Sequence, residues 1–240
     1  MFVITDANAF SSLLRRVHLS GIIGECVVNI EGGVVNIEAL DCTNSVFVHG
    51  SAKVAEEGDA VFGIGNMSTL AKFLTGNDSV EIKIQKSKDS EWLTAKRKAY
   101  GSVKFLLLDP TEVPTAVQET GVAEKISSGA SNSTVILDKA VNGLVDLCGM
   151  VGSLTVDLTV KGGLLTVSTA ERAPQQFRVP FGKMNKKEDF TVRIYSEHLL
   201  PVLKELDFSD DKKPKLFLGE NAPVIVKQGG VLWAITPLGE

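Results

Sequence analysis

The strongest constraint on the fold is a hairpin pattern that occurs twice in the chain. The stretch VNIEGGVVNIEAL covers residues 28–40, and LTVKGGLLTVSTA covers residues 158–170. In each stretch two short alternating apolar runs flank a Gly-Gly pair, and the two pairs lie 130 residues apart. Tight hairpin turns require positive φ, which glycine adopts without steric cost. The pattern predicts equivalent hairpins in two copies of one domain.

The similarity extends beyond the hairpins at the same offset. Phe62, Ile64, Leu70 and Phe73 align with Val192, Ile194, Leu200 and Leu203. Each copy reads as strand, helix, four strands, helix and three strands, which indicates an α+β fold. We therefore expect one domain at residues 1–110, a second at 132–240, and a long connecting segment at 111–131 that contains proline, glycine and serine.

Helical periodicity predicts the face that each first helix buries. The apolar positions are Phe10, Leu13, Leu14 and Val17 in the first copy, and Val141, Leu144, Val145 and Cys148 in the second. Asn66 and Ser196 are the predicted N-caps of the two second helices, because their side chains can accept hydrogen bonds from free backbone amides.

Composition excludes several classes of protein. The chain is 44% hydrophobic with a formal net charge of −4, so a uniformly basic surface is excluded while a local basic strip is not. It has no apolar run long enough to span a bilayer and no signal-peptide pattern at its start. Three widely spaced cysteines, Cys26, Cys42 and Cys148, are expected to be buried free thiols in a reducing, intracellular compartment.

A search for catalytic chemistry finds little. The three histidines, His18, His49 and His198, are scattered and lack metal-ligand spacing. The stretch GIGN at 63–66 is too short for a dinucleotide fingerprint, and no phosphate-binding loop occurs. Acidic residues such as Asp41 fall in turns, where solvated carboxylates are common. We expect no enzyme, no catalytic residue, no cofactor and no metal site.

The order of elements and three loose motifs carry a resemblance to a known family. The motifs are ALDCTNSVFV at 39–48, GENAPVIV at 219–226 and LWAITPL at 232–238. Together they resemble the DNA sliding clamps, and the two-domain length is similar to proliferating cell nuclear antigen (PCNA) and the T4-type phage clamps. The resemblance implies a closed homotrimeric ring of six similar domains, with sheets outside and two helices per copy lining a hole around double-stranded DNA. It also implies a DNA polymerase and an ATP-dependent clamp loader as partners; we expect a bacteriophage origin, hence the host cytoplasm.

Such a ring should attract phosphates without reading bases. Arg15 and Arg16, on the polar side of the first helix, are the leading candidates. Lys72, Lys139 and Lys204 follow, although Asp146, Glu197 and Glu205 make the second copy's helices near neutral. Other basic candidates are the hairpin residues Lys96, Arg97 and Lys98 and the loop residues Lys183, Lys186 and Lys187.

Two further surfaces are implied by the resemblance. Subunits should join through the last strand of the first domain and an edge strand of the second. By alternation their candidate residues are Val103, Phe105 and Leu107, with Phe177, Val179 and Phe181. Partner peptides should dock in a pocket bordered by Leu40, Phe47, Val117, Val122, Pro223, Ala234, Thr236 and Pro237. For both sets, plain core packing is the competing interpretation.

Two other functions stay open at this point. One is a structural or interaction protein, such as an oligomeric virion component built from duplicated sheets. The other is a monomeric or dimeric processivity factor of the herpesvirus type.

Overall fold

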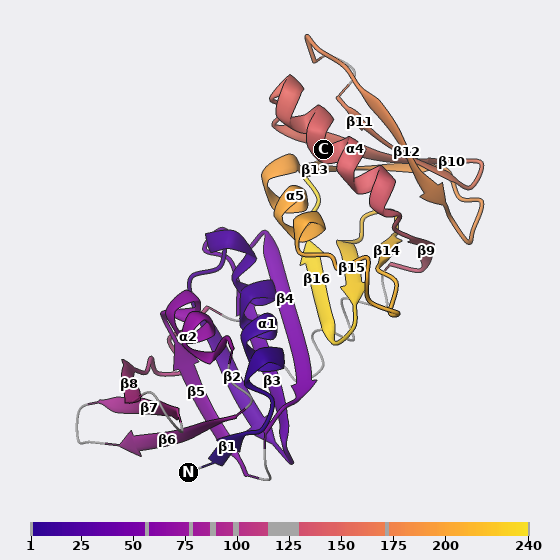
Figure 1. The fold of residues 1–240 in the computed structure, drawn as a ribbon. Helices are drawn as coiled ribbons and strands as arrows, with labels where there is room; N and C mark the ends of the chain where they lie inside the picture. Colours follow the sequence, from indigo (N-terminus) through magenta and orange to yellow (C-terminus); the bar gives the residue numbers. More distant parts are fainter. Residues whose placement is uncertain are drawn as a thin grey trace. The chain divides into compact units, whose positions relative to one another are not determined.

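The computed structural model describes residues 2–55, 58–76, 79–86, 90–97, 101–114, 130–170 and 173–239, and Figure 1 shows its elements. The chain divides into two compact units, Met1–Thr120 and Gly121–Glu240. Within the described residues, no helix is long and apolar enough to cross a membrane.

Unit 1 contains two groups of antiparallel strands and two helices. One group has the order β5-β2-β3-β4, with bounds Ala60–Ile64, Cys26–Glu31, Val34–Leu40 and Val46–Lys53. The other has the order β1-β6-β7-β8, with bounds Phe2–Ile4, Val80–Lys86, Glu91–Arg97 and Gly101–Leu106. Helices α1, Ala7–His18, and α2, Met67–Leu74, pack against each other, and α1 also contacts β3 and β4.

Unit 2 repeats this arrangement. Its sheet β12-β11-β10-β13 comprises Arg178–Lys183, Leu164–Thr169, Thr155–Lys161 and Phe190–Tyr195. A second set runs β9-β14-β15-β16, with bounds Asn132–Val135, Lys215–Leu218, Val224–Gln228 and Val231–Ile235. Helices α4, Asp138–Val151, and α5, Ser196–Lys204, contact each other. Each unit is therefore α+β, as the sequence predicted.

The two Gly-Gly hairpins have the predicted geometry. Glu31 pairs with Val34 and Lys161 pairs with Leu164, so each loop contains only the two glycines. Gly32 and Gly33 have φ of 55° and 81°, and the equivalent pair has φ of 58° and 80°. Positive φ at both central positions defines a type I′ turn, whose twist matches that of the flanking strands.

Helix faces and caps mostly follow the prediction. Phe10, Leu13, Leu14 and Val17 are buried, and the Asn66 side chain accepts a 3.3 Å hydrogen bond from the Thr69 amide. The predicted cap at Ser196 is wrong. Ser196 is the first residue of α5, and its hydroxyl donates to the Ser153 carbonyl instead. This contact with the loop between α4 and β10 outweighs the local capping preference.

The cysteine prediction is confirmed in two positions of three. All three thiols are free, and Cys26 and Cys148 are buried. Burial raises the pKa of the Cys148 thiol to about 11, and it also raises the pKa of the Cys26 thiol. Cys42 is exposed, because it lies in the turn between β3 and β4.

Candidate nucleic-acid interface and docking surfaces

The helix pair of unit 1 is held together by small polar residues. The Ser11 hydroxyl donates to the Ala71 carbonyl at 2.7 Å and lies 2.8 Å from the Thr75 hydroxyl. At the end of α2 the Gly76 amide donates to the Asn8 side chain at 2.8 Å. Small side chains at the contact bring the two helix backbones close together.

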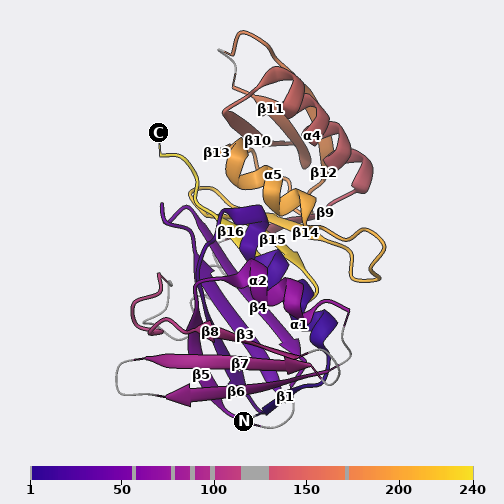
Figure 2. The same cartoon turned by 60° about the vertical axis from the view of Figure 1, so that its left-hand side comes forward.

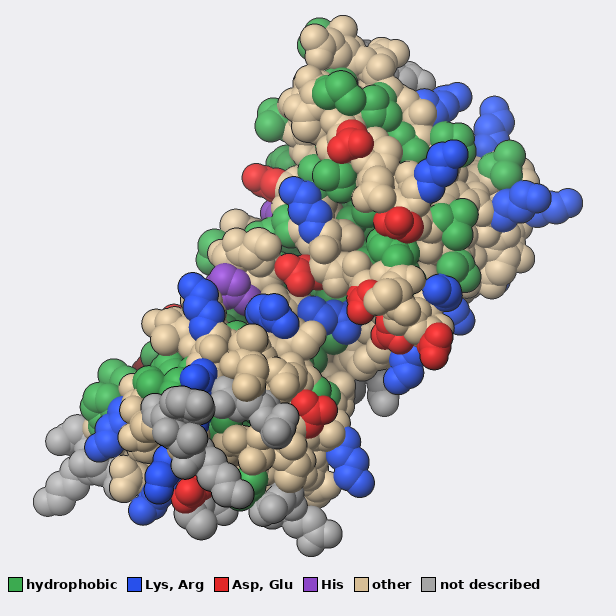
Figure 3. Space-filling view, viewed as in Figure 1, with side chains coloured by type: hydrophobic (Ala, Val, Ile, Leu, Met, Phe, Trp, Pro, Cys, Tyr) green, Lys and Arg blue, Asp and Glu red, His purple; other side chains and the backbone are tan. Residues whose placement is uncertain are grey.

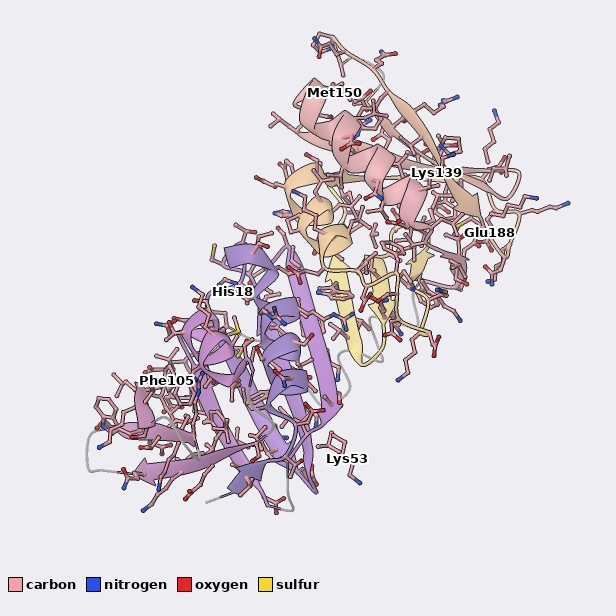
Figure 4. All side chains as sticks on the ribbon, in the orientation of Figure 1. His18, Lys53, Phe105, Lys139, Met150 and Glu188 are labelled. Atoms are coloured by element: carbon pink, nitrogen blue, oxygen red, sulfur yellow. The ribbon has the colours of Figure 1, made fainter. Side chains whose placement is uncertain are left out.

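A groove of about 430 Å³ runs between these two helices. It is lined by Leu14, Arg15, His18, Ser68, Ala71, Lys72 and Thr75. Arg15 and Lys72 are exposed, while Arg16 and His18 are half-buried. Figure 4 labels His18 at the end of α1, and Figure 3 shows Lys and Arg side chains on this face of unit 1. The structure thus brings Arg15 of α1 and Lys72 of α2 to one groove, which His18 also lines.

This face is cationic because the helices contain bases and no acids. Helix α1 carries Arg15, Arg16 and His18 in its last turn, and α2 carries Lys72 in its last turn. Cations near a helix C-terminus are stabilised by the negative end of the helix dipole. Such a surface can attract phosphate groups without reading bases.

The helices of unit 2 have a different charge pattern. Lys139 and Lys204, the predicted phosphate contacts on these helices, are exposed. The same two helices also carry Asp138, Asp146 and Glu197. Figure 3 shows acidic and basic side chains interspersed over this unit. Of the two helix pairs, that of unit 1 carries the excess of positive charge.

The remaining basic candidates are not equivalent to one another. Lys96, Lys183, Lys186 and Lys187 are predicted phosphate contacts on strands and loops, and all four are exposed. Arg97 is engaged within unit 1, since its Nε donates to the Phe73 carbonyl at 2.9 Å and its guanidinium lies 4.3 Å from the centre of the Phe73 ring. The Lys186 ammonium donates to the Ser131 hydroxyl at 2.7 Å and lies 3.9 Å from Glu188. Lys98 lies outside the described residues.

The unit 1 residues predicted to border the peptide pocket lie on either side of the turn between β3 and β4. Leu40 and Phe47 are cross-strand partners, with Leu40 half-buried and Phe47 only 4% exposed. The turn that joins them is built on Asp41, which is 3% exposed and not the solvated carboxylate that the sequence predicted. Its oxygens accept hydrogen bonds from the amides of Ser45 and Val46, both at 2.6 Å, and from Thr43. The motif ALDCTNSVFV therefore encodes a turn nucleated by a buried aspartate.

We expect Asp41→Asn to destabilise unit 1 by about 2 kcal/mol, because a neutral amide accepts fewer and weaker hydrogen bonds. Burial raises the pKa of Asp41, but the hydrogen bonds from Thr43, Val46 and Ser45 outweigh burial, and the net pKa is lowered. A lowered folded-state pKa stabilises the fold above the unfolded-state value of about 3.9, and this contribution is lost as the pH falls through the folded-state pKa. Urea unfolding at neutral pH and near pH 3 measures both effects. If the Asp41→Asn variant were as much less stable than the wild type at the lower pH as at neutral pH, this account would be contradicted.

The second half of the predicted pocket lies at the end of unit 2. Ala234 is buried in β16 and pairs with Ile225, Pro223 is half-buried and Thr236 is exposed. Pro237 lines a hollow of about 520 Å³, beside which the Leu238 amide donates to the Arg193 carbonyl at 2.8 Å. The chain end thus pairs with β13. Val117 and Val122 lie outside the described residues.

A charged pair in this hollow had no sequence signal. Arg193 on β13 donates to both carboxylate oxygens of Asp157 on β10, at 2.6 and 2.9 Å, and Asp157 is buried. The two residues are register partners on adjacent strands. Only the strand pairing brings them together, and the sequence does not fix that register.

The two strands predicted to join subunits are both edge strands of their four-stranded sheets, β8 in unit 1 and β12 in unit 2. On β8, Val103 and Phe105 are half-buried, and Leu107 just after it is buried. On or beside β12, Phe177, Val179 and Phe181 are all buried within unit 2. These last three side chains cover their own core and are not exposed for contact with a second copy.

Comparisons with known proteins agree on one fold. No family model matches the sequence, and no curated protein matches it. Among solved structures, a PCNA2–PCNA3 complex from Sulfolobus tokodaii is similar at 14% identity and a TM-score of 0.69, covering all of this chain and 99% of that one. A. fulgidus PCNA bound to the C-terminal region of FEN-1 is similar at 12% identity and 0.69, again covering 100% and 99%.

A longer protein shows the same likeness. The DNA polymerase sliding clamp from Bacillus subtilis is similar at 14% identity and a TM-score of 0.80, and this chain spans 64% of its length. The two α+β units, their equivalent hairpins and the matches that cover the whole of this chain agree. The chain has the PCNA-like sliding-clamp fold.

Proposed function

We propose that this chain is a DNA polymerase processivity factor: a sliding clamp that closes as a homotrimeric ring around duplex DNA. The observation that carries the proposal is the helix pair of unit 1, whose exposed face presents Arg15 and Lys72 and has no acidic residue in either helix. A surface that contacts phosphates weakly and without base readout allows a protein to slide along DNA. The proposal assigns no catalysis to the chain, so any ATP hydrolysis would belong to a separate loader.

The neighbours' names support the proposed partners. One is a complex of two PCNA subunits, and another is a PCNA bound to a segment of FEN-1. By analogy, this chain would assemble with its own copies and bind short peptides of a polymerase and a loader. Pro223 and Pro237 of unit 2 are proposed contributors to that peptide site. An apolar depression with a hydrophobic anchor is a common form of peptide recognition.

Topological binding distinguishes a clamp from a protein that simply adheres to DNA. We expect the chain to co-elute with nicked circular plasmid in moderate salt and to be released when a restriction enzyme linearises the same plasmid. Sedimentation should give a mass of about three times 25.7 kDa. Equal retention on circular and linear plasmid, or a monomer at micromolar concentration, would refute the ring.

A further inference from the structure

The outward face of the sheet β1-β6-β7-β8 carries an exposed aromatic residue among lysines. Trp92 on β7 is 37% exposed, and its cross-strand neighbour Leu106 on β8 is 54% exposed. The Trp92 indole NH donates to the Ser90 hydroxyl at 3.0 Å, which fixes the position of the ring. Buried Leu93 and Ala95 alternate with Trp92 along β7, so Trp92 belongs to the face opposite the core.

Strand register places the lysines in rows next to this apolar pair. The first row contains Trp92 and Leu106. The second row, next to it, contains Lys83 of β6, Thr94 of β7 and Lys104 of β8. Rows on one face are separated by about 7 Å along a strand, and Lys83 and Lys104 lie about 10 Å apart across two strand spacings. The third row contains Glu81, Lys96 and Ser102. Figure 2 shows β6 and β7 running side by side.

The charge on this face is available for a ligand. Lys83, Lys96 and Lys104 are exposed, and none of them forms an ion pair with a described residue. Among the three rows, Glu81 is the one acidic residue. A chain whose net charge is −4 therefore presents a locally cationic sheet face.

We propose that this face, defined by Trp92, Leu106, Lys83, Lys96 and Lys104, binds single-stranded nucleic acid. Lysine is depleted in protein–protein interfaces but is a common partner of phosphate, which favours a nucleic acid over an acidic protein. An exposed aromatic ring on a sheet can stack with an unpaired base, whereas the bases of a duplex are already stacked. Trp92 would stack with a base while Lys83 and Lys104 contact the adjoining phosphates.

This inference is separate from the proposed clamp activity, since the face belongs to a sheet and not to the helix pair. The probe is oligo(dT) of about ten nucleotides, within the usual range of site sizes. The chain has two tryptophans, and Trp233 is fully buried, so quenching of the tryptophan emission by oligo(dT) would report on Trp92. We expect quenching in the wild type and none in Trp92→Phe, whose phenyl ring should still bind.

Anisotropy of fluorescein-labelled oligo(dT) completes the test. We expect Trp92→Ala to weaken binding about tenfold, and Lys83→Glu with Lys104→Glu to weaken it further and to lower the salt slope by about two. The charge-matched control, Lys53→Glu with Lys215→Glu, should bind as the wild type does. Unchanged affinity in both patch variants would overturn the proposal. A Trp92 signal caused by poly-glutamate and not by oligo(dT) would assign the face to an acidic protein and also overturn it.

Discussion

Reversing two charges on the unit 1 helix pair, Arg15→Glu with Lys72→Glu, should shorten retention on nicked circular DNA about a hundredfold. The physical reason is that both side chains are exposed and line the same groove, so each reversal replaces a phosphate attraction by a repulsion. In a homotrimer the change is repeated three times around the hole. The slope of log affinity against log salt should fall by about one for each lost phosphate contact.

The matched control for this experiment lies in unit 2. Lys139→Glu with Lys204→Glu makes the same change of charge on α4 and α5, where Asp138, Asp146 and Glu197 already offset the lysines. We expect a clearly smaller loss of retention from this pair. Arg16 is left unchanged because it is half-buried. Retention that is equal in the two double variants would contradict the assignment of the DNA-binding surface to α1 and α2.

Much of the fold could be predicted because its signals are local. The Gly-Gly pairs define type I′ turns by their φ requirement, and alternation then determines the buried face of each strand. The apolar positions of α1 follow from helical periodicity in the same way. The predicted cap at Ser196 is wrong because the serine hydroxyl donates to the Ser153 carbonyl in the loop between α4 and β10, a contact distant in sequence that depends on how the sheet and the helix pack.

The candidate site was less predictable because it depends on contacts distant in sequence. Arg15 could be selected from the polar side of one helix, but its proximity to Lys72 follows from the Ser11–Ala71 contact between two helices. Arg97 has the same residue type and similar neighbours in sequence, yet the Phe73 carbonyl engages it. Asp41 shows the converse error, because its turn position predicts solvent exposure while the folded turn buries it.

The backbone edge of β8 offers a second large effect, on assembly instead of DNA binding. The Leu107 amide donates to the Glu91 carbonyl of β7 at 2.9 Å. Hydrogen-bonded and non-hydrogen-bonded pairs alternate in an antiparallel ladder. The backbone amides of Val103 and Phe105 therefore also point toward β7, and the backbone amide of Lys104 points toward the free edge. In β12 the position whose backbone amide would point toward the free edge is occupied by Pro180, between Val179 and Phe181. Proline has no amide hydrogen, and the β12 edge therefore already lacks one hydrogen-bond donor. The proposed subunit contact would therefore depend strongly on the donors of β8.

We expect Lys104→Pro to convert the proposed trimer into monomers at micromolar concentration. Proline removes the outward amide and places its ring where a partner strand would pair, while the ladder between β7 and β8 keeps its own hydrogen bonds. Sedimentation of Lys104→Pro against Lys104→Ala separates the backbone effect from loss of the charge, and the alanine variant should remain trimeric. Circular dichroism should show both variants folded. If folded Lys104→Pro sediments with the same mass as the alanine variant, subunits do not join through the edge of β8, because the β12 edge already lacks a donor at Pro180 and a second proline would remove a donor from β8 and place its ring in the contact.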